Sequence, residues 1–484
     1  MRSAQVFKAI TRINMVLLML FTLAFLVDLL YGDLSISNLA VFTVPFMVGL
    51  ILNMLQFTVF RRLFDSLTRK GKYKVAMGSF VYLVILGSLP FILSGEAGPV
   101  TAFFESMAGF TTTGLSSFDP GNLIREAGHG LLFYRVAIQW VGGLFYLVFA
   151  FMFLSDISDV AKRSADRKIF SRIGLIPKLT SLLQNLTMIY GMFTLASFLA
   201  FYLSGMSIFD SVCLSLSTVS TGGFSSTGRM VPGGAGVHMI VLFFMMTAGV
   251  GYYVHMSVFS ARGRSRTLFD TENIAYVILS LTFPVVVFII LLFDGVSVLG
   301  AAWKGAFSAI SAMTTTGFEI AGSESWPDSY KILMLILMLI GGSSLSMASG
   351  LKIQRVIMLI KGFFNEVKRA SHPNAVQSLR RGEGTYSDKA LESANMLFFY
   401  FFGLLAISIM FVLIFKGPLF DVISLCVTSL SNSGMAFGQF SVPEGIESLN
   451  WAVKLMLILV MLLGRFEILL PLYIMSPGSY RFNG

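Results

Sequence analysis

The sequence predicts an all-α polytopic membrane protein arranged around a central pore. Of its 484 residues, 55% are hydrophobic and 12% are charged, a composition that excludes an ordinary soluble globular domain. Long apolar stretches recur along the chain, and four copies of one short polar phrase lie between them. These observations favour two N-terminal transmembrane helices followed by four repeats of span, pore helix and span.

The first two spans are predicted at residues 13–30 and 39–60. Arg2, Lys8 and Arg12 precede the first apolar stretch, as they would in a signal peptide. No small-residue cleavage site follows that stretch, so we expect a retained span.

Each of the four repeats begins with a long apolar stretch and continues with a segment too short to cross a bilayer. After a polar phrase, a second long stretch ends the repeat. The predicted long spans are 75–93 and 131–154, 183–203 and 238–259, 274–293 and 331–360, and 394–415 and 452–475. The short segments, 99–110, 208–220, 298–313 and 418–430, are predicted to be re-entrant helices, which need protein or water around them at membrane depth.

This pattern divides the chain into five units. Residues 1–74 form an N-terminal two-helix unit, and 75–182 form the first pore repeat. The second repeat is 183–273, the third is 274–393 with a candidate gating loop, and the fourth is 394–484.

The four polar phrases predict an ion filter. They read FTTTGL at 110–115, VSTGGF at 219–224, TTTGF at 314–318 and LSNSGM at 430–435, and we align them on Gly114, Gly222, Gly317 and Gly434. Backbone carbonyls can replace the hydration shell of K⁺ where glycine allows successive oxygens to face one axis. None of the phrases contains an acid, which disfavours a divalent-ion site. One such phrase would be an ordinary turn, but four copies after four half-spans favour a ring.

An acid lies near the start of three half-spans: Glu105, Asp210 and Asp421. We expect these carboxylates in or before the first helical turn, where they would complement the positive end of the helix dipole. The opposite, partially negative end would then point at the polar phrase and favour a cation. Lys304 stands at the corresponding place in the third repeat, so the repeats are not interchangeable.

Two features of the later spans suggest control of the path. Arg465 falls about halfway along the last predicted span, where a buried cation costs at least ~2.5–3.5 kcal/mol. It is either a structurally paired residue or a positive charge that lines the ion path and limits flux. The small, polar stretch 341–350 would weaken a helix. It is either a close-packing surface between helices or a gate across the pore.

The formal net charge of +10 reflects topology. Lysine and arginine gather at 61–74, 162–178, 262–266 and 352–389, whereas acids dominate the opposite loops. The positive-inside rule places the basic loops, and both termini, in the cytoplasm. This basic surface would contact anionic lipid and could dock a cytosolic partner.

Enzymatic chemistry is not predicted. Cys213 and Cys426 lie in apolar segments, and we expect them to be buried thiols without a disulfide. The four histidines lack metal-ligand spacing, and no metalloprotease, nucleotide-binding or nucleophile-elbow motif is present. We therefore expect no catalytic residues and no bound cofactor.

These motifs together resemble the Trk/Ktr/HKT superfamily of potassium transporters, most closely its bacterial TrkH/TrkG-type membrane subunits. The resemblance covers nearly the whole chain. The matching segments are FESMAGFTTTG at 104–114, Arg135 with QWVGG at 139–143, FDS at 209–211 with STVSTGGF at 217–224, TTTG at 314–317 and GRFE at 464–467.

The resemblance implies a pore that four pseudo-symmetric repeats assemble, with K⁺ as the transported ion. Its implied ion ligands are Thr112, Thr113, Gly114, Ser220, Thr221, Gly222, Thr315, Thr316, Gly317, Asn432, Ser433 and Gly434. It further implies a constriction at Arg465 and a gating loop that includes Gly341, Gly342, Ser343, Ser344 and Gly350. The implied partners are a second copy of the chain, forming a homodimer, and a cytosolic nucleotide-binding regulatory subunit of TrkA type.

The sequence therefore predicts potassium uptake across the bacterial inner membrane through a channel-like filter with a gate below it. Gly114 favours K⁺, because plant relatives that favour Na⁺ carry serine at the first filter glycine. The alternative is a Na⁺-permeable transporter or a symporter coupled to H⁺ or Na⁺. A carrier with alternating access would be expected to show inverted repeats, and an intramembrane enzyme would need paired acids, a Ser-His set or a metal cluster.

Overall fold

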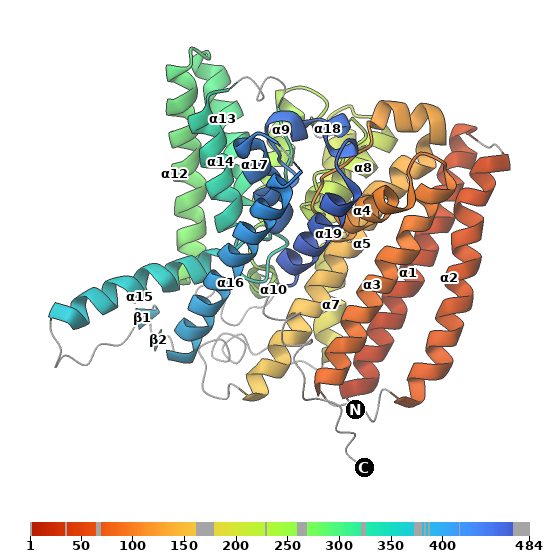
Figure 1. Cartoon of the computed structure of the whole chain (residues 1–484), viewed down its shortest axis with the longest axis horizontal. Helices are drawn as coiled ribbons and strands as arrows, with labels where there is room; N and C mark the ends of the chain where they lie inside the picture. Colours follow the sequence, from red (N-terminus) through yellow and green to blue (C-terminus); the bar gives the residue numbers. More distant parts are fainter. Residues whose placement is uncertain are drawn as a thin grey trace.

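The computed structural model describes residues 2–33, 36–63, 69–160, 179–227, 230–258, 269–320, 326–371, 380–381, 384–385, 388–415 and 417–467. Apart from one antiparallel pair of two-residue strands, β1 (Arg380–Arg381) and β2 (Gly384–Thr385), the regular elements in these ranges are helices (Figure 1). The predicted all-α fold class is confirmed.

Two long helices, α1 (Arg2–Tyr31) and α2 (Ile36–Leu63), open the chain and pack against each other. They lie together at one side of the molecule, away from α12 (Figure 1). Helix α1 also packs along α5, so the N-terminal pair is joined to the first repeat.

The next helices follow one pattern four times. A long helix is followed by a half-length helix packed against it. The long helices are α3 (Arg69–Leu93), α7 (Leu179–Leu203), α12 (Thr271–Phe293) and α16 (Asp388–Leu413). The half-length helices are α4 (Pro99–Phe110), α8 (Ile208–Ser220), α13 (Val298–Met313) and α17 (Leu419–Ser431). The predicted bounds of the first three half-length helices are confirmed, and the fourth is shifted by one residue.

Local sequence explains where the half-length helices begin. Pro99 occupies the first turn of α4, where its missing N–H is not needed. The Ser207 and Ser297 hydroxyls accept hydrogen bonds from the backbone N–H groups of Asp210 and Gly300, and so cap α8 and α13.

After each half-length helix the chain passes through a polar phrase and enters another helical segment. These segments are α5 (Pro120–Val160), α9 (Ala235–Ala248) with α10 (Tyr252–Val258), α14 (Asp328–Ile340) and α19 (Trp451–Arg465). Each contacts the half-length helix of the following repeat: α5 with α8, α9 with α13, α14 with α17, and α19 with α4. The contacts form a closed cycle, so the four half-length helices surround one axis.

Two of the predicted long spans are broken, the second of them within the stretch 341–350 that the sequence predicts to weaken a helix. The span 238–259 is bent by 95° between α9 and α10. The span 331–360 is interrupted at 341–352, after which α15 (Ile353–Ser371) projects from the body (Figure 1). Gly249 and Gly251 lie at the first break, and Gly341 and Gly350 lie at the second.

The ten predicted spans can be tested only over the described residues. Five described helices are long and apolar enough to cross a membrane, and α9 with α10 would make a sixth. Helices α1 and α2 are 30 and 28 residues long, and the apolar parts of them whose side chains the structure describes are Met15–Tyr31 and Leu39–Leu55. Helix α19 ends at Arg465, and the remainder of the predicted last span lies outside the described residues from 468 onward.

Glycine allows the later helix of a repeat to approach the end of its half-length helix. A Cβ atom on Gly142 of α5 would overlap the backbone carbonyl of Phe110, and one on Gly464 of α19 would overlap that of Leu430. Two different repeats therefore use the same contact, helix backbone against half-helix backbone, where no side chain fits.

We expect Gly142→Ala to destabilise the protein by ~1–3 kcal/mol, because the added methyl group must push two backbones apart. Thermal unfolding of the detergent-purified protein, followed by the loss of the monodisperse peak, measures the effect. Gly191→Ala is the matched control, since it lies in α7 and no described atom lies within 4 Å of its Cβ position. If both variants melt like the parent protein, the close approach at Gly142 does not contribute to stability.

Candidate ion-conducting site

The four polar phrases share one backbone conformation. A residue just after each half-length helix is left-handed, with φ of +53° at Thr112, +53° at Thr221, +52° at Thr315 and +50° at Asn432. A glycine two positions later also has positive φ: +75° at Gly114, +79° at Gly223, +81° at Gly317 and +80° at Gly434.

Threonine is an unusual residue for the left-handed region. Its branched Cβ crowds the backbone there, and a strained residue of this kind costs ~1–3 kcal/mol. Three of the four left-handed positions nevertheless carry threonine. Such strain persists only where the surrounding structure imposes it, which marks this ring as a functional candidate.

The structure places Gly223, rather than Gly222, at the position equivalent to Gly114. The residue before the shared glycine donates its N–H to a carbonyl five residues earlier in every repeat. These bonds are Thr113 to Ala108 (2.8 Å), Gly222 to Ser217 (2.9 Å), Thr316 to Ser311 (2.9 Å) and Ser433 to Thr428 (3.0 Å). The aligned phrases are therefore TTTGL, STGGF, TTTGF and SNSGM. The apolar residue after the glycine, Leu115, Phe224, Phe318 or Met435, could have revealed this register from sequence alone.

The four phrases form a closed ring of backbone contacts. A Cβ on each shared glycine would overlap a carbonyl oxygen of a neighbouring repeat. The pairs are Gly114 with Gly222, Gly223 with Thr316, Gly317 with Ser433, and Gly434 with Thr113. The structure thus brings all twelve predicted ligand residues into one assembly, and each of them is buried.

Hydroxyl groups support two of the phrases internally. The Thr111 and Thr113 hydroxyls lie 2.7 Å apart, and those of Thr314 and Thr316 lie 2.8 Å apart. The Asn432 side chain joins the fourth phrase to the first by donating to Thr113 Oγ1 at 2.9 Å. Within the described part of the chain, Thr112 Oγ1, Asn432 Oδ1 and Ser433 Oγ are buried without a hydrogen-bond partner.

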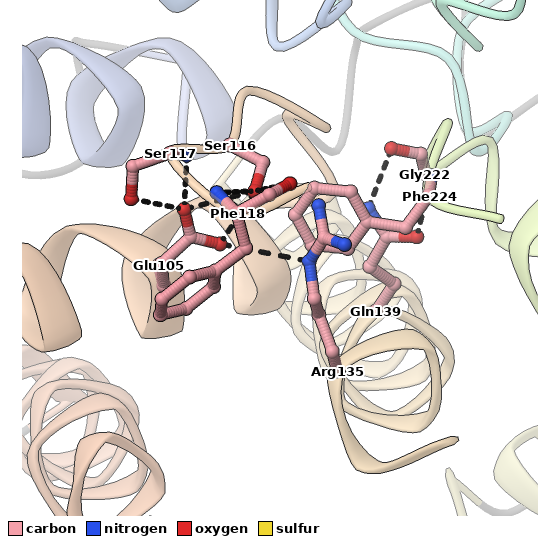
Figure 2. Close-up of polar contacts among 8 residues, drawn as sticks. All are labelled: Glu105, Ser116, Ser117, Phe118, Arg135, Gln139, Gly222 and Phe224. Atoms are coloured by element: carbon pink, nitrogen blue, oxygen red, sulfur yellow. Dashed lines mark hydrogen bonds and ion pairs between the residues drawn. The ribbon is translucent and has the colours of Figure 1, made fainter. Parts of the chain in front are cut away.

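Glu105 has a different role from the predicted one. It lies in the middle of α4, fully buried, and not in the first turn. Its carboxylate accepts hydrogen bonds from Ser117 N (2.5 Å), Ser117 Oγ (2.9 Å) and Ser116 Oγ (3.0 Å) (Figure 2). Glu105 therefore anchors the segment after the first phrase.

The other two acids lie at the start of their helices, as predicted, and also anchor the segment after the phrase, as Glu105 does. Asp210 and Asp421 do lie in first turns, as predicted. Asp210 accepts from Ser226 Oγ at 2.5 Å, and Asp421 accepts from Gln439 N at 3.0 Å. Each acid thus holds the segment that follows its own phrase. In the third repeat, which lacks the acid, Ser311 Oγ donates to the Phe318 carbonyl at 2.8 Å.

Helix α5 holds the second phrase from the side (Figure 2). Arg135 and Gln139 are four residues apart and share a helix face. The Arg135 guanidinium carbon lies 4.0 Å from the centre of the Phe224 ring, and Arg135 Nε lies 3.6 Å from the Glu105 carboxylate. Gln139 Nε2 donates to the Gly222 carbonyl at 2.5 Å. The family resemblance pointed to both residues only as part of a motif, because no local pattern shows that α5 crosses to the next repeat.

Residues 341–352 form a loop and not a helical packing surface. Positive φ angles occur at Gly341, Leu345, Gly350 and Lys352. The loop fills the bend between α9 and α10: Ser343 N donates to Gly249 O, Met347 N donates to Ala248 O, and Tyr252 N donates to Leu345 O. This insertion explains why the predicted span 238–259 is broken.

The loop contacts the ring and Arg465 at once. Ser349 N donates to Thr315 Oγ1 at 2.8 Å, and Thr221 Oγ1 donates to Met347 O at 3.2 Å. Arg465 Nη1 donates to Met347 O at 2.9 Å and to Ser349 Oγ at 2.7 Å. Two of the left-handed threonines therefore bind the loop on the side where Arg465 lies.

Arg465 is at the C-terminal end of α19, and the part of the predicted span beyond residue 467 lies outside the described residues. It is 1% exposed, and its guanidinium carbon lies 4.1 Å from the centre of the Tyr146 ring of α5. The helix terminus and the aromatic face both favour a positive charge. Sequence reasoning missed Tyr146, because its contact with Arg465 joins residues from different repeats.

The predicted buried thiols agree with the structure. Cys213 in α8 and Cys426 in α17 are both free and buried.

Comparison with known proteins identifies relatives over the full length. The TrkH family, described as cation transport proteins, matches residues 66–476. The Trk system potassium uptake protein TrkH of Salmonella typhimurium is 31% identical, with 98% of this chain and 99% of that protein covered. TrkG of Escherichia coli K12 is 26% identical, with 85% of each chain covered. The crystal structure of the potassium transporter TrkH from Vibrio parahaemolyticus superimposes with a TM-score of 0.86 at 25% identity, covering 99% of this chain and 100% of that one.

We expect the buried pair of Glu105 and Arg135 to be energetically coupled. Glu105→Gln should cost ~3–5 kcal/mol, because it removes the carboxylate opposite a buried guanidinium. In the double variant Glu105→Gln/Arg135→Met, part of this loss should be recovered. A double-mutant cycle on thermal or denaturant unfolding measures the coupling. Strict additivity of the two single losses would show that the pair does not act as a unit.

Proposed function

The chain belongs to the TrkH family of cation transport proteins, and we propose that it is the multi-pass membrane subunit of a potassium uptake system. K⁺ passes along the axis that the four half-length helices surround. The observation that carries the proposal is the ring of four phrases with one shared backbone conformation and mutual glycine–carbonyl contacts.

The chemistry of the ring fits a monovalent cation. The twelve proposed ligand residues offer the oxygens of backbone carbonyls, hydroxyls and one side-chain amide, all of which are uncharged ligands for a cation. The C-terminal ends of the four half-length helices meet the ring, and their partial negative charge lowers the energy of a cation there. No carboxylate belongs to the four phrases, so a tightly held divalent ion is disfavoured.

The loop 341–352 acts as the gate, and Arg465 acts as the electrostatic barrier below the filter. Support comes from their position: the loop is bonded to Thr221 and Thr315, and Arg465 is bonded to the loop. In this proposal, opening of the gate breaks these bonds. A fixed positive charge in a narrow path also repels K⁺.

The remaining parts of the proposal concern assembly and location. The chain works as a homodimer in the bacterial inner membrane, with both termini in the cytoplasm. The relatives are named as parts of a Trk system, which supports a complex with further components. A cytosolic subunit of TrkA type binds the regulatory nucleotide, and it docks on the basic cytoplasmic loops.

Uptake of ⁸⁶Rb⁺ into proteoliposomes that contain the purified chain tests the proposal. Competition by K⁺ at much lower concentration than Na⁺ is expected. Equal competition by the two ions would favour the alternative, a Na⁺-permeable or Na⁺-coupled transporter. A pH gradient that drives uptake without a membrane potential would indicate coupling to H⁺.

We expect Gly114→Ser to lower the preference for K⁺ over Na⁺ by roughly ten-fold or more, because the added side chain overlaps the Gly222 carbonyl in the filter ring. The measurement is the ratio of Na⁺ and K⁺ concentrations that halve ⁸⁶Rb⁺ uptake. Gly205→Ser is the matched control: its φ is also positive, at +90°, but no described atom lies within 4 Å of its Cβ position. A parental ratio in Gly114→Ser would remove the filter assignment.

Arg465→Ala should raise the rate of ⁸⁶Rb⁺ flux several-fold, since it removes both the positive charge and two bonds to the loop. Initial uptake rates, normalised to folded protein, measure this. Arg369→Ala provides the control, because it removes a positive charge from exposed α15, outside the proposed path. Unchanged or slower flux through well-folded Arg465→Ala would exclude the barrier role.

A further inference from the structure

The second phrase lacks a side chain where the other three carry a hydroxyl. Thr113, Thr316 and Ser433 occupy this position, and Gly222 occupies it in the second repeat. In the first and third phrases, the hydroxyl of this threonine bonds to that of the threonine two residues earlier and so fixes the conformation of the phrase. Gly222 cannot form such a bond, although its carbonyl belongs to the ring.

Gln139 occupies the space that the missing side chain leaves. A Cβ atom on Gly222 would overlap the Gln139 amide. The glutamine is completely buried and comes from α5, a helix of the preceding repeat. Figure 2 shows its amide pointing at the Gly222 carbonyl and the Phe224 backbone.

The partners of Gln139 determine how its amide is oriented. The Phe224 N–H can only donate, and it meets Oε1 at 3.3 Å. Ser217 Oγ also donates to Oε1, at 3.2 Å. Nε2 is therefore the atom that faces the Gly222 carbonyl, where it donates at 2.5 Å. One side chain thus joins helix α8, the ring carbonyl and the residue after the shared glycine.

We propose that Gln139 is a positioning residue for ion selectivity, which holds the Gly222 carbonyl at the angle that a dehydrated K⁺ requires. This inference rests on the proposed function and names a residue outside the four phrases that sets their selectivity. Gln139 replaces, from the neighbouring repeat, the threonine–threonine bond of the first and third phrases. Its amide acts on the ring carbonyl itself, whereas those threonine pairs act through their own side chains.

Gln139→Met tests the inference, because methionine keeps the approximate length of the side chain and removes the amide, both its donor and its acceptor. The variant loses the bonds from Ser217 Oγ and Phe224 N as well as the bond to the Gly222 carbonyl. Loss of the bond to the ring carbonyl should lower the ratio of Na⁺ to K⁺ concentrations that halve ⁸⁶Rb⁺ uptake by roughly two- to ten-fold. Tyr134→Phe is the matched control: it removes a buried hydrogen bond between α5 and the Gly87 carbonyl of α3, and neither residue belongs to the four phrases. Its ratio should stay parental.

A side-chain exchange supplies the rescue. Gly222→Thr alone should reduce folded protein or uptake, because the new side chain overlaps Gln139. Gln139→Ala alone should lower selectivity. The double variant Gln139→Ala/Gly222→Thr gives the second phrase a hydroxyl like that of the first and third, and should recover most of the parental ratio. A general structural role would restore folding without restoring the ratio.

The outcomes separate this inference from the filter proposal. A parental ratio in folded Gln139→Met, with a lowered ratio in Gly114→Ser, overturns the role of Gln139 and leaves the filter in place. Parental ratios in both variants remove the filter itself. If Gln139→Met does not fold, the exchange decides: a folded double variant with no better selectivity than Gln139→Ala overturns the inference.

Discussion

The contact between a glycine at positive φ and the carbonyl oxygen of a neighbouring repeat is the constraint on which this architecture depends. Four such contacts close the ring, and none leaves room for a Cβ atom. The half-length helices must end at one depth for the contacts to form, and the later helices must pass close behind them. Gly142 and Gly464 allow that approach. The arrangement requires strained backbone conformations at three threonines, and the buried surroundings of the ring hold these residues in place.

The elements of the fold could largely be predicted from hydropathy and length. The half-length helices were the clearest case, because apolar segments of 12 to 16 residues bounded by Pro, Ser or Gly are too short to cross a bilayer as helices. Breaks inside long spans were harder to predict. Residues 238–259 are largely apolar, and the bend at Gly249 exists because a loop from the next repeat inserts there. Nothing in the local sequence contains that information.

In the site, too, local features could be predicted from the sequence, whereas contacts between distant segments could not. Repetition of the phrase was visible in the sequence. In the second repeat the apolar Phe224 favoured the correct register, and the hydrogen bonds of the structure fix it. Two consecutive glycines made both alignments possible. The role of Glu105 was also beyond local reasoning, because its partners Ser116 and Ser117 follow the phrase after a turn back along the helix. Arg465 was recognisable as a costly charge, but its aromatic and loop partners come from distant segments.

The four phrases share one backbone conformation, but they differ in the side-chain hydrogen bonds that hold them. The second and third phrases are bonded to the loop through the Thr221 and Thr315 hydroxyls. In the first phrase, the equivalent Thr112 hydroxyl has no partner among the described residues. In the fourth phrase, the Asn432 amide donates to Thr113 and Met461 instead. Movement of the loop therefore acts directly on only half the ring.

The second phrase, which lacks an internal threonine pair, is the one that α5 holds through both a hydrogen bond and a stacked guanidinium. The proposed filter is joined to the proposed gate on one side, and it needs support on that side that does not move with the loop. Arg135 and Gln139 provide such support, because α5 belongs to the first repeat and the loop 341–352 belongs to the third. The proposed selectivity can therefore persist while the loop opens, since the bonds that shape the second phrase are separate from those that opening must break.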